Sequence, residues 1–107
     1  MGKASQAKGK RGEEEITGIL RGYGYDVTRG ASQNYGSEPD VAGLPGIHLE
    51  IKRAEHLRLN AAVEQAKRDS ERFQDGLPAV IHRANKQPWK VTMLLSDWLQ
   101  LYDRLPF

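Results

Sequence analysis

Two acidic residues and a lysine have the types and spacing that could bind a cation and carry out hydrolytic chemistry. Asp40 follows Pro39, and Glu50 and Lys52 stand two positions apart a short distance further on. The intervening residues 43–46, with the sequence GLPG, predict a tight turn, because proline and glycine supply the fixed and the positive φ angles of a reversal. Such a turn folds two strands into a hairpin and brings Asp40 beside Glu50.

A divalent cation is the partner that this pair of acids predicts. Two carboxylates held close together repel each other strongly unless a cation lies between them. Mg²⁺ binds one or two carboxylates together with water and phosphate oxygens, and we expect Mn²⁺ to substitute for it. Lys52 beside such a site can orient or deprotonate an attacking water, or stabilise charge on the scissile phosphate. The alternative is a small α/β binding domain whose acidic and basic residues form surface pairs.

The segment 47–53 is the clearest strand in the sequence. Apolar and polar residues alternate along it, so one face is predicted to be core and the other polar. The polar face carries His48, Glu50 and Lys52. His48 there either hydrogen-bonds a ligand or is a hydrogen-bonded neighbour of Glu50.

A helix over residues 12–22 supplies further carboxylates. Its apolar residues recur at three- and four-residue spacing, and glycines end it. With the apolar stripe in the core, Glu14 points outward, whereas Glu13 and Glu15 flank the stripe. Either flanking acid could reach the sheet, and periodicity does not choose between them.

The remaining segments complete an α/β fold. We expect strands at 25–29, 39–42, 79–83 and 89–95, and helices at 59–73 and 96–104. The resulting order, α-β-β-β-α-β-β-α, predicts a mixed central β-sheet flanked by helices.

The last expected helix carries a strongly apolar stripe. Ser96 is its predicted N-cap, and Trp98, Leu99 and Tyr102 are predicted to be buried. Trp89 and Phe107 are also most simply explained as core residues. Alternatively, part of the C-terminal stripe seals a dimer.

Length and composition narrow the classes of function. At 107 residues we expect a single domain over 1–107, with residues 1–8 a flexible basic arm. The absence of cysteine excludes disulfides, a thiolate nucleophile and a zinc site built on sulfur. No apolar run approaches the roughly 20 residues of a membrane span. With no secretory signal at the start, we expect a cytoplasmic protein.

Basic residues mark the candidate DNA contacts. The net charge of +2 is mild, but basic residues cluster at the N-terminus and recur later. Such clusters often bind nucleic-acid phosphates, although they also serve as solvated surface. The candidates are Lys8, Lys10, Arg11, Arg53, Arg68 and Arg83.

The acidic hairpin resembles a known nuclease signature. Pro39-Asp40, a turn, then Glu50-Ile51-Lys52 is similar to the motif of the PD-(D/E)XK nuclease superfamily. Lys8-Gly9, Glu13, an apolar helix, a strand ending in Arg29 and a Ser/Gly-rich loop extend the likeness to the archaeal-type Holliday junction resolvases and their phage relatives. The resemblance covers roughly residues 8–83 and implies a restriction-endonuclease-like fold.

The resemblance also assigns roles to individual residues. It implies that Asp40 and Glu50 are metal ligands, that Lys52 is the catalytic lysine and that Glu13 is the helix carboxylate. It further implies that the backbone carbonyl of Ile51 faces the metal and that Gln65 approaches the site. Arg29 and Ser32 join the expected DNA contacts. Glu14 stands where the family often has a basic residue.

The expected activity is that of a Mg²⁺-dependent, structure-selective DNA endonuclease, a homodimeric Holliday junction resolvase of bacterial, archaeal or phage origin. The chain leaves no segment for reading base sequence in the major groove, so selection by DNA shape is favoured. One alternative is a nuclease of the same fold that acts on nicks, flaps or ends. Another is a non-catalytic DNA-binding accessory protein. The dimer could form through a sheet edge or through the last helix.

Overall fold

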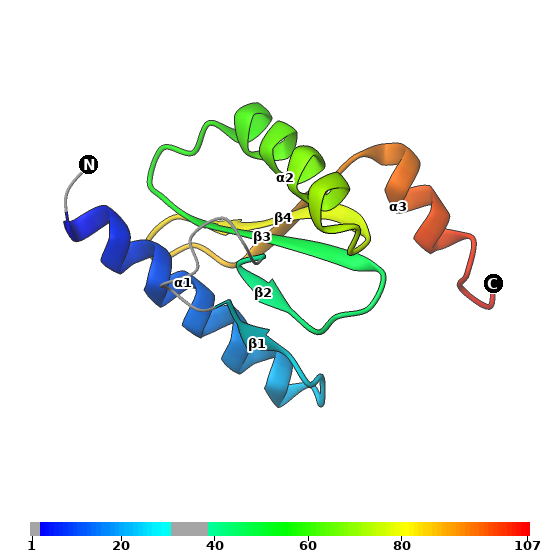
Figure 1. Ribbon diagram of the computed structural model, residues 1–107, viewed down its shortest axis with the longest axis horizontal. Coiled ribbons are helices and arrows are strands. Elements are labelled where there is room, and N and C mark those ends of the chain that lie inside the picture. Colours follow the sequence, from blue (N-terminus) through cyan, green and yellow to red (C-terminus); the bar gives the residue numbers. More distant parts are fainter. Residues whose placement is uncertain (1–2, 31–38) are drawn as a thin grey trace.

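A five-stranded sheet lies between two helices in the computed structural model (Figure 1). The structure describes residues 3–30 and 39–107, with side chains from residue 8 onward in the first range. The elements are α1 (Lys3–Gly22), β1 (Thr28–Arg29), β2 (Val41–Ala42), β3 (Ile47–Arg53), α2 (Leu59–Phe73), β4 (Leu77–Arg83), β5 (Lys90–Met93) and α3 (Leu95–Tyr102). Their order confirms the predicted α-β-β-β-α-β-β-α arrangement.

The sheet is mixed, and β3 is its central strand. The strand order is β1-β2-β3-β4-β5, with antiparallel pairing throughout except between β3 and β4, which are parallel. A parallel pair needs a crossover connection, and α2 provides it. β3 and β4 pair over their full length, from Ile47 opposite Leu77 to Arg53 opposite Arg83. This long pairing holds the strand that carries the predicted signature.

Helices cover β3 on both faces. Leu49 and Ile51 point toward α1, where they form a core with Ile16. On the opposite face Val80 packs against two alanines of α2, and Val80 is the register partner of Glu50. The face of β3 that was predicted to be polar is therefore covered by α2, and Glu50 on that face is only 3% exposed. Alternation correctly separated the faces but did not reveal that a second helix covers the polar one.

α1 begins earlier than the sequence pattern predicted. The helix starts at Lys3, so residues 3–8, which were predicted to be part of a flexible arm over 1–8, belong to α1. Alanine, glutamine and lysine favour helix in this segment, and extending an existing helix needs no second nucleation. Gly12 is an interior residue where α1 crosses β3, because a Cβ there would lie 3.2 Å from the Cβ of Arg53.

α3 lies at one end of the molecule, beyond the sheet (Figure 1). Its N-cap is Leu94 rather than the predicted Ser96, and none of its residues is buried. The prediction that Trp98, Leu99 and Tyr102 are core residues is wrong, since each is more than two-fifths exposed. The rings of Trp98 and Tyr102 stack on each other at 5.3 Å instead. Among residues 3–30 and 39–107, no apolar layer covers α3.

The two remaining aromatic residues predicted to lie in the core have different environments. Trp89 packs against the α1 core, as predicted, whereas Phe107 is 95% exposed, contrary to its predicted place in the core. Along the described ranges, no helix combines the length and the apolar character of a membrane span.

Candidate active site

The β2–β3 hairpin places Asp40 beside Glu50. Val41 pairs with Leu49 across the hairpin, and Asp40 directly precedes the short strand β2. The carboxyl group of Asp40 accepts a hydrogen bond from the backbone N–H of Ile51 at 3.2 Å, which sets it beside the carboxyl group of Glu50. The juxtaposition expected from the turn sequence is therefore present.

Two glycines in the turn between β2 and β3 allow this approach. Gly43 has a φ of +107°, and a Cβ at that position would lie 2.5 Å from the carbonyl oxygen of Asp26. Gly46 has a φ of +90°. Any other residue would be strained in these conformations, so the GLPG sequence determines how closely the two acids approach.

The two carboxyl groups differ in their proton affinity. Burial, followed by the charges of Glu50 and Glu13, raises the pKa of Asp40 to about 7. Burial also opposes ionisation of Glu50, but a hydrogen bond with His48 and the charge of Lys52 outweigh it and hold the pKa of Glu50 below its usual value. A cation between the two acids would relieve the repulsion that raises the pKa of Asp40. This buried, oxygen-rich pair fits a hard divalent cation.

Glu13 of α1 is the helix acid that faces the pair. Its carboxylate accepts hydrogen bonds from Arg29 at 3.2 and 3.3 Å. Burial raises its pKa, Arg29 opposes that shift, and Glu50 adds to it. Glu14 is more exposed and lies 3.8 Å from Arg29. The structure thus resolves the choice that periodicity left open, since Glu15 points toward a different part of the sheet.

Lys52 lies beside Glu50 and is held by α2. Its Nζ donates a hydrogen bond to Oε1 of Gln65 at 2.9 Å and lies 3.6 Å from Oε2 of Glu50. Gln65 therefore approaches the site from the following helix, as the resemblance implied. The amide restricts the flexible lysine side chain to the region of the acids.

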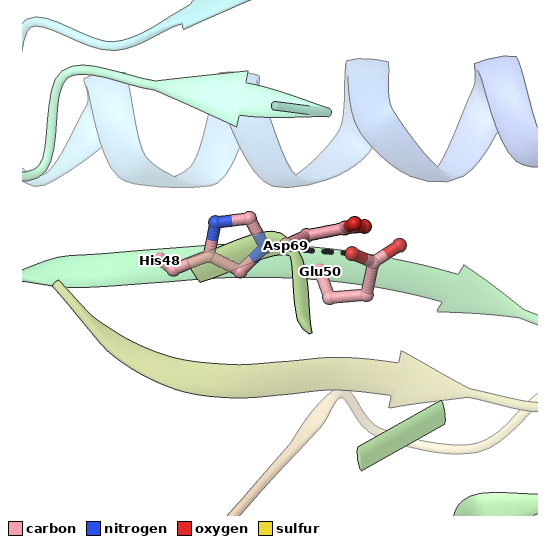
Figure 2. A group of neighbouring side chains, drawn as sticks. All are labelled: His48, Glu50 and Asp69. Carbon is pink, nitrogen blue, oxygen red and sulfur yellow. Dashed lines mark hydrogen bonds and ion pairs between the residues drawn. The ribbon is translucent and has the colours of Figure 1, made fainter. Parts of the chain in front are cut away.

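Asp69 and His48 extend the cluster beyond the predicted residues. Among the described residues, ligand atoms of His48, Glu50 and Asp69 lie within 4.8 Å of one another. Figure 2 shows these three side chains gathered over β3, with Asp69 contributed by α2. Sequence reasoning missed Asp69. The available signal was its position four residues after Gln65, since residues at that spacing share one helix face.

Three of the arginines predicted to bind DNA already bind acids. Arg29 pairs with Glu13, while Arg53 and Arg83 both contact Glu15, at 3.4 and 2.9 Å. The Arg53 and Arg83 side chains are only 14% and 17% exposed. These two arginines fasten α1 to the ends of β3 and β4, which is a structural role that the sequence did not predict.

The other DNA-binding candidates have different environments. Lys10 and Arg11 on α1 and Arg68 on α2 are exposed, and Lys8 is half-buried. Ser32 lies outside the described residues. Their assignment to DNA contact stays a prediction.

A comparison with solved structures identifies the fold. The chain is similar to Hjc of Archaeoglobus fulgidus, described as a Holliday junction resolvase from an archaeal hyperthermophile, with a TM-score of 0.57. The match covers 78% of this chain and 73% of the resolvase at 20% sequence identity. The chain has the fold of that resolvase. The expected restriction-endonuclease-like architecture is confirmed. No family model matches the sequence, and a search of curated proteins found no match.

Proposed function

We propose that this protein is a metal-dependent, structure-selective DNA endonuclease that hydrolyses phosphodiester bonds in branched DNA, with the Holliday junction as its preferred substrate. The observation that carries the proposal is the buried contact between Asp40 and Glu50 with Lys52 adjacent to it. A protein that only bound phosphates would gain nothing from clustered acids, because they repel the ligand. The resolvase fold supports the same reading.

Asp40 and Glu50 would hold the cation, with Glu13 and the backbone carbonyl of Ile51 as further ligands. Bound Mg²⁺ supplies Lewis-acid stabilisation of the phosphate and lowers the pKa of a water molecule. Arg29 orients Glu13 toward the two acids through the hydrogen bonds between them.

Lys52 contributes a positive charge and a hydrogen-bond donor at the reacting phosphate. Gln65 and Glu50 hold its Nζ next to the acids. From that position the ammonium group orients the attacking water or stabilises charge on the phosphate. Burial around Glu50 strengthens such electrostatic effects, because little water screens them.

A homodimer accounts for two symmetric cuts in one junction, since each chain provides one site. The exposed apolar side chains of α3 favour the last helix over a sheet edge as the interface. The exposed Lys10 and Arg11 of α1 would contact phosphates. We place this activity in the cytoplasm of a bacterial, archaeal or phage-infected cell.

Cleavage of matched DNA substrates tests the proposal. A four-way junction, a flap and a linear duplex of equal length are incubated with the protein and Mg²⁺, with Asp40→Asn as the control. The proposal predicts paired nicks in the junction and little cutting of the linear duplex. Equal cutting of all three substrates would exclude junction selectivity, and preferential cutting of the flap would assign the alternative substrate.

A further inference from the structure

His48 is a buried histidine that the proposed reaction does not use. It lies on β3 beneath α2 and is only 1% exposed. Its Nδ1 is 2.9 and 3.0 Å from the carboxylate oxygens of Asp75, and its Nε2 is 3.5 Å from Oε1 of Glu50. The ring of Phe73 stacks on it at 6.2 Å. The imidazole therefore joins an acid at the edge of the molecule to an acid in the candidate site.

A buried histidine at position 48 needs hydrogen-bond partners for its ring nitrogens, which an apolar residue there would not need. Burying a polar group without a partner costs free energy, and the same face of the sheet carries an apolar cluster of Val80 with Ala62 and Ala66 of α2. Asp75 satisfies Nδ1 and thereby fixes the orientation of the ring. Once Nδ1 is bound, Nε2 has one direction left, and that direction is Glu50. An outer carboxylate that orients a histidine in this way is a recurring feature around metal sites.

The chain around Asp75 is itself tightly constrained. Gln74, the C-cap of α2, has a left-handed conformation with φ +53°, and its N–H donates a hydrogen bond to the carbonyl oxygen of Ser70. Gly76 has a φ of +127°, and a Cβ there would lie 2.2 Å from the carbonyl carbon of Gly46. Leu77 then donates a backbone hydrogen bond to Gly46 at 2.9 Å. The turn that carries Asp75 is thus fastened to the turn of the acidic hairpin.

We propose that His48 and Asp75 are positioning residues for Glu50. His48 holds Oε1 of Glu50, which leaves Oε2 on the side of Lys52. The contact stops the carboxylate from rotating about its terminal bond, and it keeps Glu50 in place despite the nearby acid Asp69. This inference rests on the proposed function, because it assigns Glu50 to cation binding.

Divalent-ion affinity, measured separately from cleavage, tests the inference. Mn²⁺ binding is followed by calorimetry without DNA, and cleavage is measured as a function of Mg²⁺ concentration. Asp75→Asn should weaken Mn²⁺ affinity about 10-fold, the lower end of effects reported for such outer partners. The same variant should raise the Mg²⁺ concentration for half-maximal cleavage by the same factor, while its cleavage rate at saturating Mg²⁺ stays close to that of the wild type. Loss of a residue with a purely structural role would not raise the required Mg²⁺ concentration while leaving the rate at saturating Mg²⁺ unchanged.

Variants at His48 provide a graded series. His48→Gln keeps an amide that can donate to Glu50, whereas His48→Leu removes every donor. The expected order of Mn²⁺ affinity is wild type, then His48→Gln, then His48→Leu. Glu71→Gln, which removes an exposed acid from α2, is the matched control and should change nothing.

The outcomes separate this inference from the proposed function. If the wild-type protein neither binds Mn²⁺ nor cuts DNA, the proposed function fails and the inference with it. If the wild-type protein does both and Asp75→Asn matches it in metal dependence, only the positioning role is overturned. Loss of the fold in Asp75→Asn, shown by circular dichroism, would also overturn it, because the pair would then be part of the structural core.

Discussion

Asp40, directly before β2, accepts a hydrogen bond from the backbone N–H of Ile51 on β3 and so lies beside the carboxyl group of Glu50 in one hairpin. Burial and mutual repulsion leave the first acid with a pKa of about 7, while the second is held ionised by His48 and Lys52. A buried acid pair of this kind is unfavourable for stability and favourable for cation binding. The effect on stability can be measured on the metal-free protein, and the effect on cleavage can be measured with Mg²⁺ present.

The stability of the metal-free protein should depend on Asp40. Its pKa is about 7 in the folded chain against 3.8 as the reference. Between these values the folded state keeps a proton that the unfolded state has released, so stability falls as pH rises through this window. Glu50 acts in the opposite sense only at lower pH, because its lowered pKa adds stability above 4.5 that is lost on acidification.

Thermal melting in chelator at pH 5 and pH 7.5 checks this expectation. The wild-type melting temperature should be lower at the higher pH, and Asp40→Asn should reduce the difference. The part that remains comes from His48, whose raised pKa also makes stability fall as pH rises. Saturating Mg²⁺ should raise the melting temperature of the wild-type protein at the higher pH. An equal pH effect in the variant would contradict the assignment to Asp40.

Lys52→Ala should reduce the cleavage rate at least about 10²-fold, a typical loss for one preorganised electrostatic or acid–base group. Mn²⁺ binding should survive, because the carboxylates remain. Single-turnover rates at saturating Mg²⁺ and DNA provide the measurement. Lys90→Ala, which alters an exposed lysine of β5, is the control. A normal cleavage rate for Lys52→Ala would show that Lys52 has no catalytic role.

The acids of α1 should differ in their effects. Glu13→Gln should lower the cleavage rate most, since Glu13 faces Asp40 and Glu50. Glu14→Gln should have the smallest effect. Glu15→Gln should instead lower the melting temperature, because it leaves Arg53 and Arg83 partly buried without their acid. Cleavage rates and melting curves for all three variants test this, and a larger rate loss for Glu14 than for Glu13 would contradict the site geometry.

The exposed surface of α3 should mediate dimerisation. Trp98→Ser should convert a dimer to a monomer, because it removes a large apolar side chain that is 48% exposed in the single chain. Analytical ultracentrifugation at micromolar concentration measures the change. Tyr23→Ser, at an exposed position directly after α1, is the control. A wild-type monomer, or a Trp98→Ser dimer, would exclude α3 as the interface.

Local patterns were sufficient to predict the elements that carry the site. β3 and α2 have the predicted bounds, 47–53 and 59–73, because their alternation and helical spacing are continuous. Gly46 directly precedes β3, and Gly76 lies shortly after α2. The hairpin between Asp40 and Glu50 was predictable from the turn sequence for the same reason. These features depend on residues close together in the chain.

Features that depend on distant contacts were not predictable. The partners of His48 are Glu50, two residues away, and Asp75, on the far side of α2. Nothing in the spacing of these residues indicates that a helix covers them. The apolar stripe of α3 was read as core, because hydrophobic spacing identifies a face that avoids water without showing what covers it.

Cleavage of a four-way junction by the wild-type protein with Mg²⁺ or with excess chelator tests the central claim most directly. The account predicts paired nicks at symmetry-related positions with Mg²⁺, none with chelator, and none from Asp40→Asn under either condition, although that variant still binds the junction. Full cleavage in excess chelator, or by Asp40→Asn, would contradict it.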